Sequence, residues 1–415
     1  MLYNINRIHF FRGLKMVRNI VGAPVRDDDL FGREDFIQLL WTKLEVTNVL
    51  LTAPRRFGKT SVMYHLYDHP QNDYRVIHLD LERIQEPVNF IIELLEQIKR
   101  DSILSKLITD PIKKLGKFFE DHIHSFGLDL EGFSFKVELK KRIQDDWQDF
   151  ADNILDRLKI SSQKILFIFD ELAFMLEHFE ENEISDKEIK SFLYWFRNFR
   201  QSPEIGITNC AFLLGSSIGL DQYLATRNIS AVINDLERIT LSEFTDRQAN
   251  TFVNELCKGE KLSLSPRQKN KMLELVSPPI PYFIQVFFSE ILKAAKIKKR
   301  KITPAVIEEI YYEDVLGVNS KGYFIHYYER LRHYSKPNEH ISKLFLKQLC
   351  MNESLPKRHL LNQFEKEYGK QDIDAFNLLI SNLENDYYIK YNVQNDHYYF
   401  ASNILKDWWR RYYGL

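Results

Sequence analysis

Short apolar runs alternate with helical stretches along the chain from Thr47 onward. The apolar runs predict strands at 47–52, 74–80, 164–169, 209–214 and 237–241. Strands that alternate with helices in this way are typical of a parallel α/β sheet. Two of the runs, KILFIF and NCAFLL, are almost continuously apolar, as in strands that are buried on both faces. We therefore predict an α/β fold in which these two strands lie centrally.

The interval between the second and third strands is unusually long, and we interpret residues 106–146 as an insertion. Within it, the segment FSFKVEL at 133–139 alternates apolar and polar positions, which predicts a half-buried strand. From Trp147 onward the apolar positions recur at helical spacing. The insertion should therefore end in a strand followed by a helix.

The strand pattern ends at Leu241, and helical patterns follow it. Two capping-box sequences predict helices near 245–257 and 265–276, namely Thr245 with Gln248 and Ser265 with Gln268. Residues 242–295 are thus interpreted as a small helical region, which ends at the basic run KIKKRK (296–301).

The last part of the chain, 296–415, predicts helices, a hairpin and a final helix. The hairpin strands are 387–391 and 397–400. Three helices followed by a hairpin is the layout of a winged-helix domain. Its aromatic residues exceed what a small core can bury, so some should be exposed and dock a partner or another domain. The alternative is that the hairpin packs on the terminal helix and buries most of them.

Composition and charge narrow the class of protein. The chain has 415 residues, of which 44% are apolar and 28% charged, as in ordinary globular proteins. Its formal net charge of −1 provides no global field toward nucleic acid or membrane, although residues 292–415 are mildly basic. Three dispersed cysteines indicate neither a disulfide framework nor a zinc site. We expect a cytoplasmic protein without membrane contact, with 1–16 as an N-terminal extension.

The segment APRRFGKTS carries the strongest chemical signal, because it follows a predicted strand and opens a helix. It matches the phosphate-binding pattern G-x-x-x-x-G-K-[ST] except for alanine at the first glycine. Backbone N–H groups of such a loop and of the helix start surround phosphate oxygens. Gly58 allows close approach, Lys59 reaches the terminal phosphates and the Thr60 hydroxyl suits Mg²⁺. The predicted nucleotide-binding residues of the loop are Ala53, Pro54, Arg55, Arg56, Phe57, Gly58, Lys59, Thr60 and Ser61.

Two further strand ends supply candidate catalytic groups. The strand ILFIF ends in Asp170 and Glu171, at the edge where doubly wound sheets bind ligands. Asp170 would hold Mg²⁺ and Glu171 would polarise the attacking water. Ser216, after the strand NCAFLL, could contact the γ-phosphate or that water. For the neighbouring Ser217, a helix cap is an equally good interpretation. ATP and Mg²⁺ are therefore the expected ligands.

These motifs, together with GRE at 32–34, LLGSS and the stretch 236–249, resemble the STAND and origin-recognition-related branch of AAA+ ATPases. The resemblance spans roughly 17–415. It implies a P-loop ATPase core at 17–241, a helical lid at 242–295 and a winged-helix domain at 296–415. It also implies that Gly32 and Arg33 line the adenine side of the nucleotide.

The resemblance further implies a lid turn that approaches the nucleotide, which falls here on Pro281. The glycine of that turn is replaced, so a rigid loop before a helix is the alternative interpretation. AAA+ assemblies also use an arginine from a neighbouring subunit on the transition state. The candidates are Arg197, Arg200 and Arg227, and an ordinary ion-paired role is the alternative for each, as for Arg55 and Arg56.

Two hypotheses about function remain. In the first, ATP binding and slow hydrolysis drive a regulatory switch that acts on a protein partner or through self-assembly. In the second, the winged helix binds duplex DNA. The acidic ATPase half and a hairpin tip without basic residues favour the first hypothesis.

Overall fold

The computed structural model describes residues 17–113, 133–159, 161–201, 209–216, 220–369 and 371–414. A parallel sheet of five strands lies at the centre of the core, in the order β2-β3-β4-β1-β5. The strands are β1 (Asn48–Thr52), β2 (Tyr74–Asp80), β3 (Lys164–Asp170), β4 (Cys210–Ser216) and β5 (Leu236–Thr240). All five predicted strands are confirmed. β3 and β4 lie inside the sheet, and every residue of β4 is buried.

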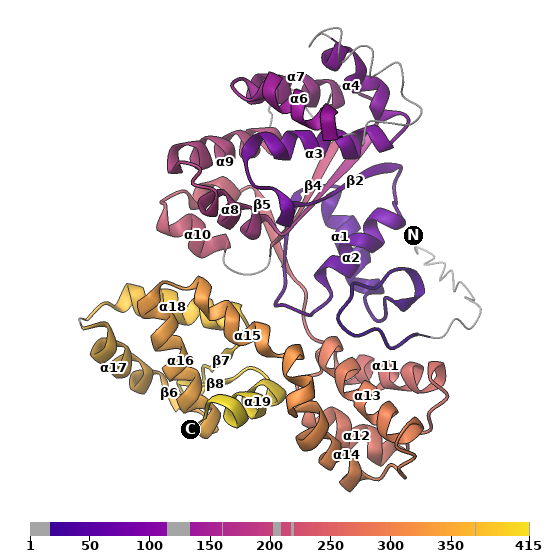
Figure 1. Cartoon of the computed structure of the whole chain (residues 1–415), viewed down its shortest axis with the longest axis vertical. Coiled ribbons are helices and arrows are strands. Elements are labelled where there is room, and N and C mark those ends of the chain that lie inside the picture. The colour runs from indigo at the N-terminus through magenta and orange to yellow at the C-terminus, as the bar shows by residue number, and fades with distance from the viewer. Residues whose placement is uncertain are drawn as a thin grey trace, which may run out of the picture.

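Helices cover both faces of this sheet (Figure 1), as expected for strands that are apolar on both sides. One face packs against α1 (Glu34–Leu44) and α2 (Lys59–Asp68). The other face packs against α3 (Pro87–Arg100), α8 (Leu172–Glu181), α9 (Asp186–Gln201) and α10 (Leu220–Thr226). The short turns η1 (Asp27–Asp29), η2 (Leu81–Arg83) and η3 (Ser230–Ile233) complete the described core.

The described chain between α3 and β3 is mainly helical. It contains α4 (Leu104–Lys113), α6 (Phe133–Ile143) and α7 (Trp147–Lys159); residues 114–132 lie outside the described part. The strand predicted at 133–139 is therefore wrong. Positions 135, 139 and 143 are spaced by four residues, so they lie on the same face of a helix. On that face α6 buries Leu139 and Ile143. Lys136 of α6 pairs with Glu93 and Glu96 of α3, which fixes the helix against the core.

Beyond β5 the chain forms α11 (Asp246–Gly259), α12 (Pro266–Leu275) and α13 (Pro281–Lys296), here termed the lid helices. Both predicted capping boxes are present, at Thr245 with Gln248 and at Ser265 with Gln268. These reciprocal bonds satisfy orphan N–H groups at the helix starts. The helices predicted near 245–257 and 265–276 are thus confirmed.

The remainder, 304–414, is termed the C-terminal unit. It begins with α14 (Pro304–Ile310), the π-helical turn η4 (Tyr311–Val315), η5 (Val318–Tyr323), α15 (Ile325–Arg330) and η6 (Leu331–His333). Then come α16 (Lys336–Met351), β6 (Leu355–Pro356), α17 (Lys357–Tyr368), α18 (Ile373–Asn385), β7 (Ile389–Asn392), β8 (His397–Phe400) and α19 (Asn403–Tyr413). The three strands form an antiparallel sheet in the order β6-β8-β7, so the predicted hairpin is present.

Most aromatic residues of the C-terminal unit are buried, although Tyr312 and Tyr399 are exposed, as the sequence predicted for some of them. The hairpin packs on α19, which is the alternative that the sequence left open. Trp408 and Trp409 are at most 1% exposed, and Tyr388 is 1% exposed. In β8, Tyr399 is 36% exposed, whereas Tyr398 is 4% exposed. The aromatic excess is thus mainly a core.

Candidate functional site

The predicted phosphate loop connects β1 to α2 at the carboxyl edge of the sheet. Gly58 is the N-cap residue of α2 and has φ 94°, a backbone conformation that favours glycine. Arg56 also has a positive φ of 72°, whereas Ala53 is outside that region. Alanine at the first glycine position is therefore compatible with this loop. The start of α2, with its outward N–H groups, is the part of the loop suited to phosphate oxygens.

Lys59 lies buried between the two carboxylates that the sequence singled out. Its Nζ contacts Asp170 Oδ1 and lies 3.0 Å from Glu171 Oε1, with the side chain 7% exposed. Burial alone would lower the pKa of Lys59, but the two carboxylates outweigh it and raise that pKa. Burial alone would likewise raise the pKa of Asp170, and Lys59 and Thr60 hold it below its ordinary value. Both groups are therefore charged near neutral pH.

Thr60 and Asp170 bring two oxygen ligands together. The Thr60 hydroxyl donates to Asp170 Oδ2 at 2.9 Å. Mg²⁺ prefers oxygen ligands and is held by few protein groups together with phosphates and water. Within the described ranges no group of three His, Cys, Asp or Glu side chains could hold a metal ion. The donor set thus fits an ion that takes its remaining ligands from nucleotide and water.

Glu171 stands at the junction of β3 and α8. It is the N-cap residue of α8 and has φ 61°, a strained conformation for a residue other than glycine. Such backbone strain clusters at functional sites. Its side chain is 20% exposed and borders the same cavity as Thr60. Glu171 is thus the more accessible of the two carboxylates.

A cavity of about 380 Å³ opens above the loop, within the size range of ligand pockets. Of the predicted residues, its walls include Arg33, the whole loop 53–61, Glu171 and Pro281. Sequence reasoning missed further walls, which come from several distant segments: Gly22, Ala23, Pro24, Val25, Asp29, Leu30, Phe31, Glu82, Phe174, Phe244, Phe252, Tyr282 and Gln285. Phe31 stacks on Phe252 with ring centroids 5.2 Å apart. This end of the cavity is therefore flat and apolar, as a nucleobase requires.

Arg33 is 7% exposed and holds the loop from behind. Its guanidinium donates to the Phe57 carbonyl at 3.2 Å and lies 4.7 Å from the Phe244 ring centroid. Burial lowers its pKa to about 10. Gly32 does not border the cavity; its carbonyl accepts a hydrogen bond of 2.9 Å from Gln248 Nε2 of α11. Gly32 thus ties a lid helix to the core.

Ser216 lies at the end of β4 beside Thr52 of β1, and its residue is 1% exposed. It borders a second cavity, of about 360 Å³, across the loop from the first one. Ser217 lies outside the described residues. Gly215, which precedes Ser216, packs directly against Asp170. A Cβ at position 215 would come within 2.4 Å of Asp170 Oδ1 and 2.5 Å of Met63 Cε. Glycine at 215 therefore leaves the space that Asp170 occupies.

We expect Gly215→Ala to destabilise the protein by roughly 1–3 kcal/mol, because the added methyl group overpacks the sheet edge and displaces Asp170. Urea unfolding followed by circular dichroism would measure the loss. Gly322→Ala is the matched control, since a Cβ at Gly322 meets no atom within 4 Å. Equal unfolding midpoints for the two variants would contradict this account of Gly215.

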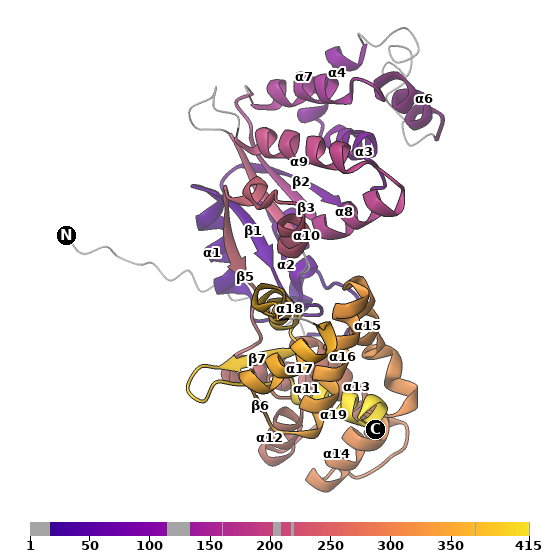
Figure 2. The same ribbon diagram turned by 90° about the vertical axis from the view of Figure 1, so that its left-hand side faces the viewer.

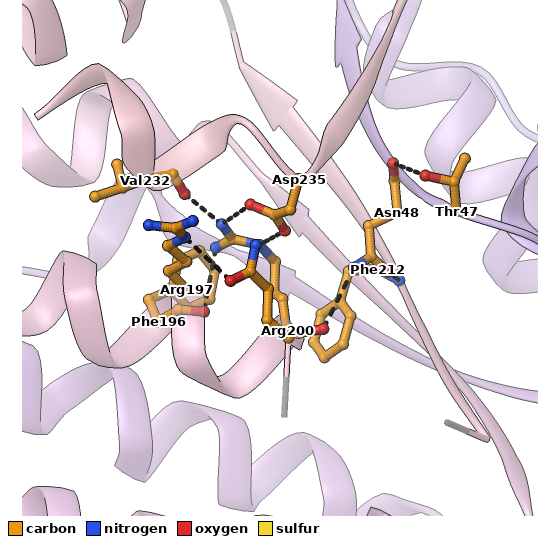
Figure 3. Close-up of polar contacts among 9 residues, drawn as sticks. Thr47, Asn48, Phe196, Arg197, Arg200, Phe212, Val232 and Asp235 are labelled. Atoms are coloured by element: carbon orange, nitrogen blue, oxygen red, sulfur yellow. Dashed lines mark hydrogen bonds and ion pairs between the residues drawn. The ribbon is translucent and has the colours of Figure 1, made fainter. Parts of the chain in front are cut away.

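The candidate arginines have ordinary partners within this chain. Arg200 donates to Asp235 at 2.9 Å and to the Phe196 carbonyl at 3.1 Å, with its side chain 1% exposed (Figure 3). It is thus a buried structural arginine. Arg197 donates to Gln201 at 3.1 Å. Arg227 pairs with Glu180 and stacks on Tyr223 at 3.9 Å. The ion-paired alternative therefore describes Arg200 and Arg227.

The two loop arginines point to different neighbours. Arg56 donates to the Gly22 carbonyl at 2.8 Å and lies 4.8 Å from the Tyr282 ring centroid, which links the loop to both sides of the cavity mouth. Arg55 lies 5.3 Å from the Phe174 ring centroid, and its carbonyl accepts from the Tyr327 hydroxyl at 3.4 Å. Both arginines therefore contact protein as well as bordering the cavity.

The five-stranded parallel sheet, with helices on both faces and the loop between β1 and α2, has the α/β architecture of a P-loop NTPase core. The structure is similar to the Walker-type ATPase PABY2304 of Pyrococcus abyssi, with a TM-score of 0.63 at 17% identity over 94% of this chain and 99% of that chain. It is also similar to the ORC2 protein of Aeropyrum pernix, solved with ADPNP and ADP, with a TM-score of 0.55 at 11% identity over 92% and 94%. At these identities the likeness shows the fold.

No family model and no curated protein matches the sequence. Across the residues that the structure describes, no helix is long and apolar enough to span a membrane.

Proposed function

We propose that this chain binds and slowly hydrolyses ATP with Mg²⁺ and acts as a nucleotide-dependent regulatory switch for a protein partner or for its own assembly. The observation that carries the proposal is the convergence of Lys59, Thr60, Asp170 and Glu171 beside a cavity with an apolar end. The fold shared with a Walker-type ATPase and with an ORC2 protein solved with ADPNP and ADP supports ATP as the ligand.

Each residue has a role that its position supports. Lys59 and the N–H groups at the start of α2 would bind the terminal phosphates, and Thr60 and Asp170 would hold Mg²⁺. Bound Mg²⁺ neutralises charge that develops on the phosphates during hydrolysis. Glu171 would orient the attacking water and accept its proton. Ser216 stays a proposed phosphate sensor, and Arg33 would support the loop.

The proposal includes the arrangement of parts. Residues 17–241 would be the ATPase core, 242–295 the lid and 296–415 a winged-helix domain, as in the STAND and origin-recognition-related branch. Pro281 at the start of α13 borders the nucleotide cavity, which supports a lid that responds to the nucleotide. Slow turnover suits a switch, because the ATP-bound state must persist long enough to act.

DNA binding by the winged helix finds less support. Recognition helices enter the major groove with basic or polar side chains. The corresponding helix, α18, contains Asp374 and Glu384 but no Lys or Arg. The basic run at 296–301 is largely neutralised by ion pairs of Lys296 with Glu260, Lys298 with Asp314 and Arg300 with Glu309. If the purified protein bound random duplex DNA with an affinity that fell steeply as the salt concentration rose, DNA binding would be supported after all.

Calorimetry of ATP binding with Mg²⁺ and with EDTA tests the proposal. We expect Mg²⁺ to tighten ATP binding to the parent protein. Asp170→Asn should lose most of that tightening and retain binding in EDTA, because the substitution removes a metal ligand and releases Lys59. Asp221→Asn is the control, since Asp221 pairs with Arg238 and does not border this cavity. The proposal fails if the parent protein binds no ATP under either condition.

A further inference from the structure

The lid helices and the C-terminal unit are joined through a continuous aromatic core. Phe283 stacks on Phe324 with centroids 5.6 Å apart, and Phe287 lies 5.5 Å from Tyr311. All four of these side chains are fully buried. Separating the lid helices from the C-terminal unit would therefore expose large apolar surfaces to water.

Polar contacts reinforce this junction at three separate points. The Asn403 N–H, at the start of α19, donates to the Ser277 carbonyl at 2.8 Å. Tyr282 of α13 donates to the Tyr323 carbonyl at 3.3 Å. Gln268 of α12 donates to the Ile302 carbonyl at 2.6 Å. Hydrogen bonds therefore join the lid helices to the C-terminal unit in addition to the aromatic core.

The C-terminal unit meets the core mainly at the outer side of the phosphate loop. In both views α15 and α18 are its parts nearest the core (Figures 1 and 2). Tyr327 of α15 donates to the Arg55 carbonyl, and the Tyr387 ring meets Phe57 edge-on at 4.9 Å. Lys390 of β7 pairs with Glu243, just after β5, at 2.9 Å. These few contacts are here termed the seat.

Buried groups hold the seat residues in place from within the C-terminal unit. Asp386, directly before Tyr387, accepts from Arg330 at 2.7 Å and from Tyr334 at 2.7 Å. The Tyr388 hydroxyl donates to the Tyr327 carbonyl. These hydrogen bonds therefore link the two seat tyrosines to one another within the C-terminal unit.

We infer that the lid helices and the C-terminal unit form one rigid body, which straddles the phosphate loop and moves as a whole when the loop changes. The lid helices border the cavity on its inner side, through Tyr282 and Pro281, while Tyr327 and Tyr387 rest on the outer side. The inference deepens the proposed switch and rests on it for the role of nucleotide. Bound nucleotide therefore moves the lid helices and the C-terminal unit together, and the lid helices do not move by themselves.

A disulfide across the junction tests the rigid body. The backbone bond between Asn403 and Ser277 brings their backbones close enough for the pair Ser277→Cys/Asn403→Cys to form one. The experiment uses the full chain with this cysteine pair and Glu171→Gln, and records the small-angle scattering profile with ATP and with ADP. The difference between the ATP and ADP profiles should be the same whether the disulfide is formed or reduced. Loss of that difference on oxidation would overturn the inference, as would bound nucleotide that changes the profile of neither form.

Hydrogen exchange on the nucleotide-free chain tests the seat independently of ATP. Tyr327→Phe removes the hydroxyl that bonds to the loop, and exchange across 53–61 should become roughly two- to tenfold faster. Tyr399→Phe, in the exposed part of β8, is the control and should leave the loop unchanged. Unchanged loop exchange in Tyr327→Phe would overturn the seat. A chain that binds no ATP yet shows this effect would refute the proposed function while keeping the seat.

Discussion

Lys59→Ala is expected to weaken ATP binding by at least about 100-fold in calorimetry, below the range in which binding is measurable. The terminal phosphates would lose a buried charge-assisted contact, and truncating one partner of such a pair costs about 2–5 kcal/mol. Lys59 lies between Asp170 and Glu171, and these two carboxylates hold its ammonium group at the loop. An unchanged affinity would refute the site.

The Lys59 variant needs two controls, because it also leaves Asp170 buried without its cation. Breaking a buried ion pair in this way destabilises proteins by roughly 3–5 kcal/mol. The double variant Lys59→Ala/Asp170→Asn removes both charges and should regain much of the lost stability without regaining ATP binding. Lys43→Ala removes a surface lysine paired with Glu237 and should bind ATP like the parent protein. Recovery of binding in the double variant would show that Lys59 acts through folding alone.

Glu171→Gln is expected to keep ATP affinity within about threefold and to reduce turnover by roughly 10²–10⁴-fold, the usual contribution of a general base. The substitution preserves the shape of the side chain and its reach toward Lys59, 3.0 Å away. It removes the group that accepts the proton of the attacking water. Phosphate release from saturating ATP, measured alongside ATP affinity, separates the two effects.

Glu82 provides a matched control from the same cavity. It follows β2, the strand beside β3, and borders the cavity as Glu171 does. Glu82→Gln should hydrolyse ATP at nearly the parent rate. If Glu82→Gln loses turnover and Glu171→Gln retains it, the proton acceptor belongs to the neighbouring strand, and the assignment of Glu171 is wrong.

The sequence predicted the parts of the molecule that local pattern determines. The five strands and the two capping boxes follow from contiguous residues, as do the loop 53–61 and the carboxylates after β3. The segment 133–139 failed because its alternation coexists with a four-residue spacing, and packing on α3 selected the helix. Burial of Trp408 and Trp409 was left open, since it depends on the hairpin folding onto α19.

The apolar end of the cavity could not be predicted from local pattern. Phe31, Phe252 and Tyr282 lie far apart along the chain and meet only because the lid helices fold back onto the core. The separation of Ser216 from the main cavity has a similar origin. β4 ends on the far side of the loop, next to β1, and strand order is not apparent from the individual strands.

Under the proposed function, the ion pair between Lys59 and Asp170 would compete with phosphate for the lysine. An anion that bound Lys59 would have to displace the Asp170 carboxylate, so its apparent affinity would be reduced by the fraction of molecules in which the ion pair is still formed. A phosphate ligand that brought a divalent cation would satisfy both separated partners at once, with phosphate at the lysine and metal at the carboxylate. Sulfate, inorganic phosphate and metal-free nucleotides satisfy only the lysine. Under the proposed function, the loop would therefore favour the Mg²⁺ complex of ATP over simple anions.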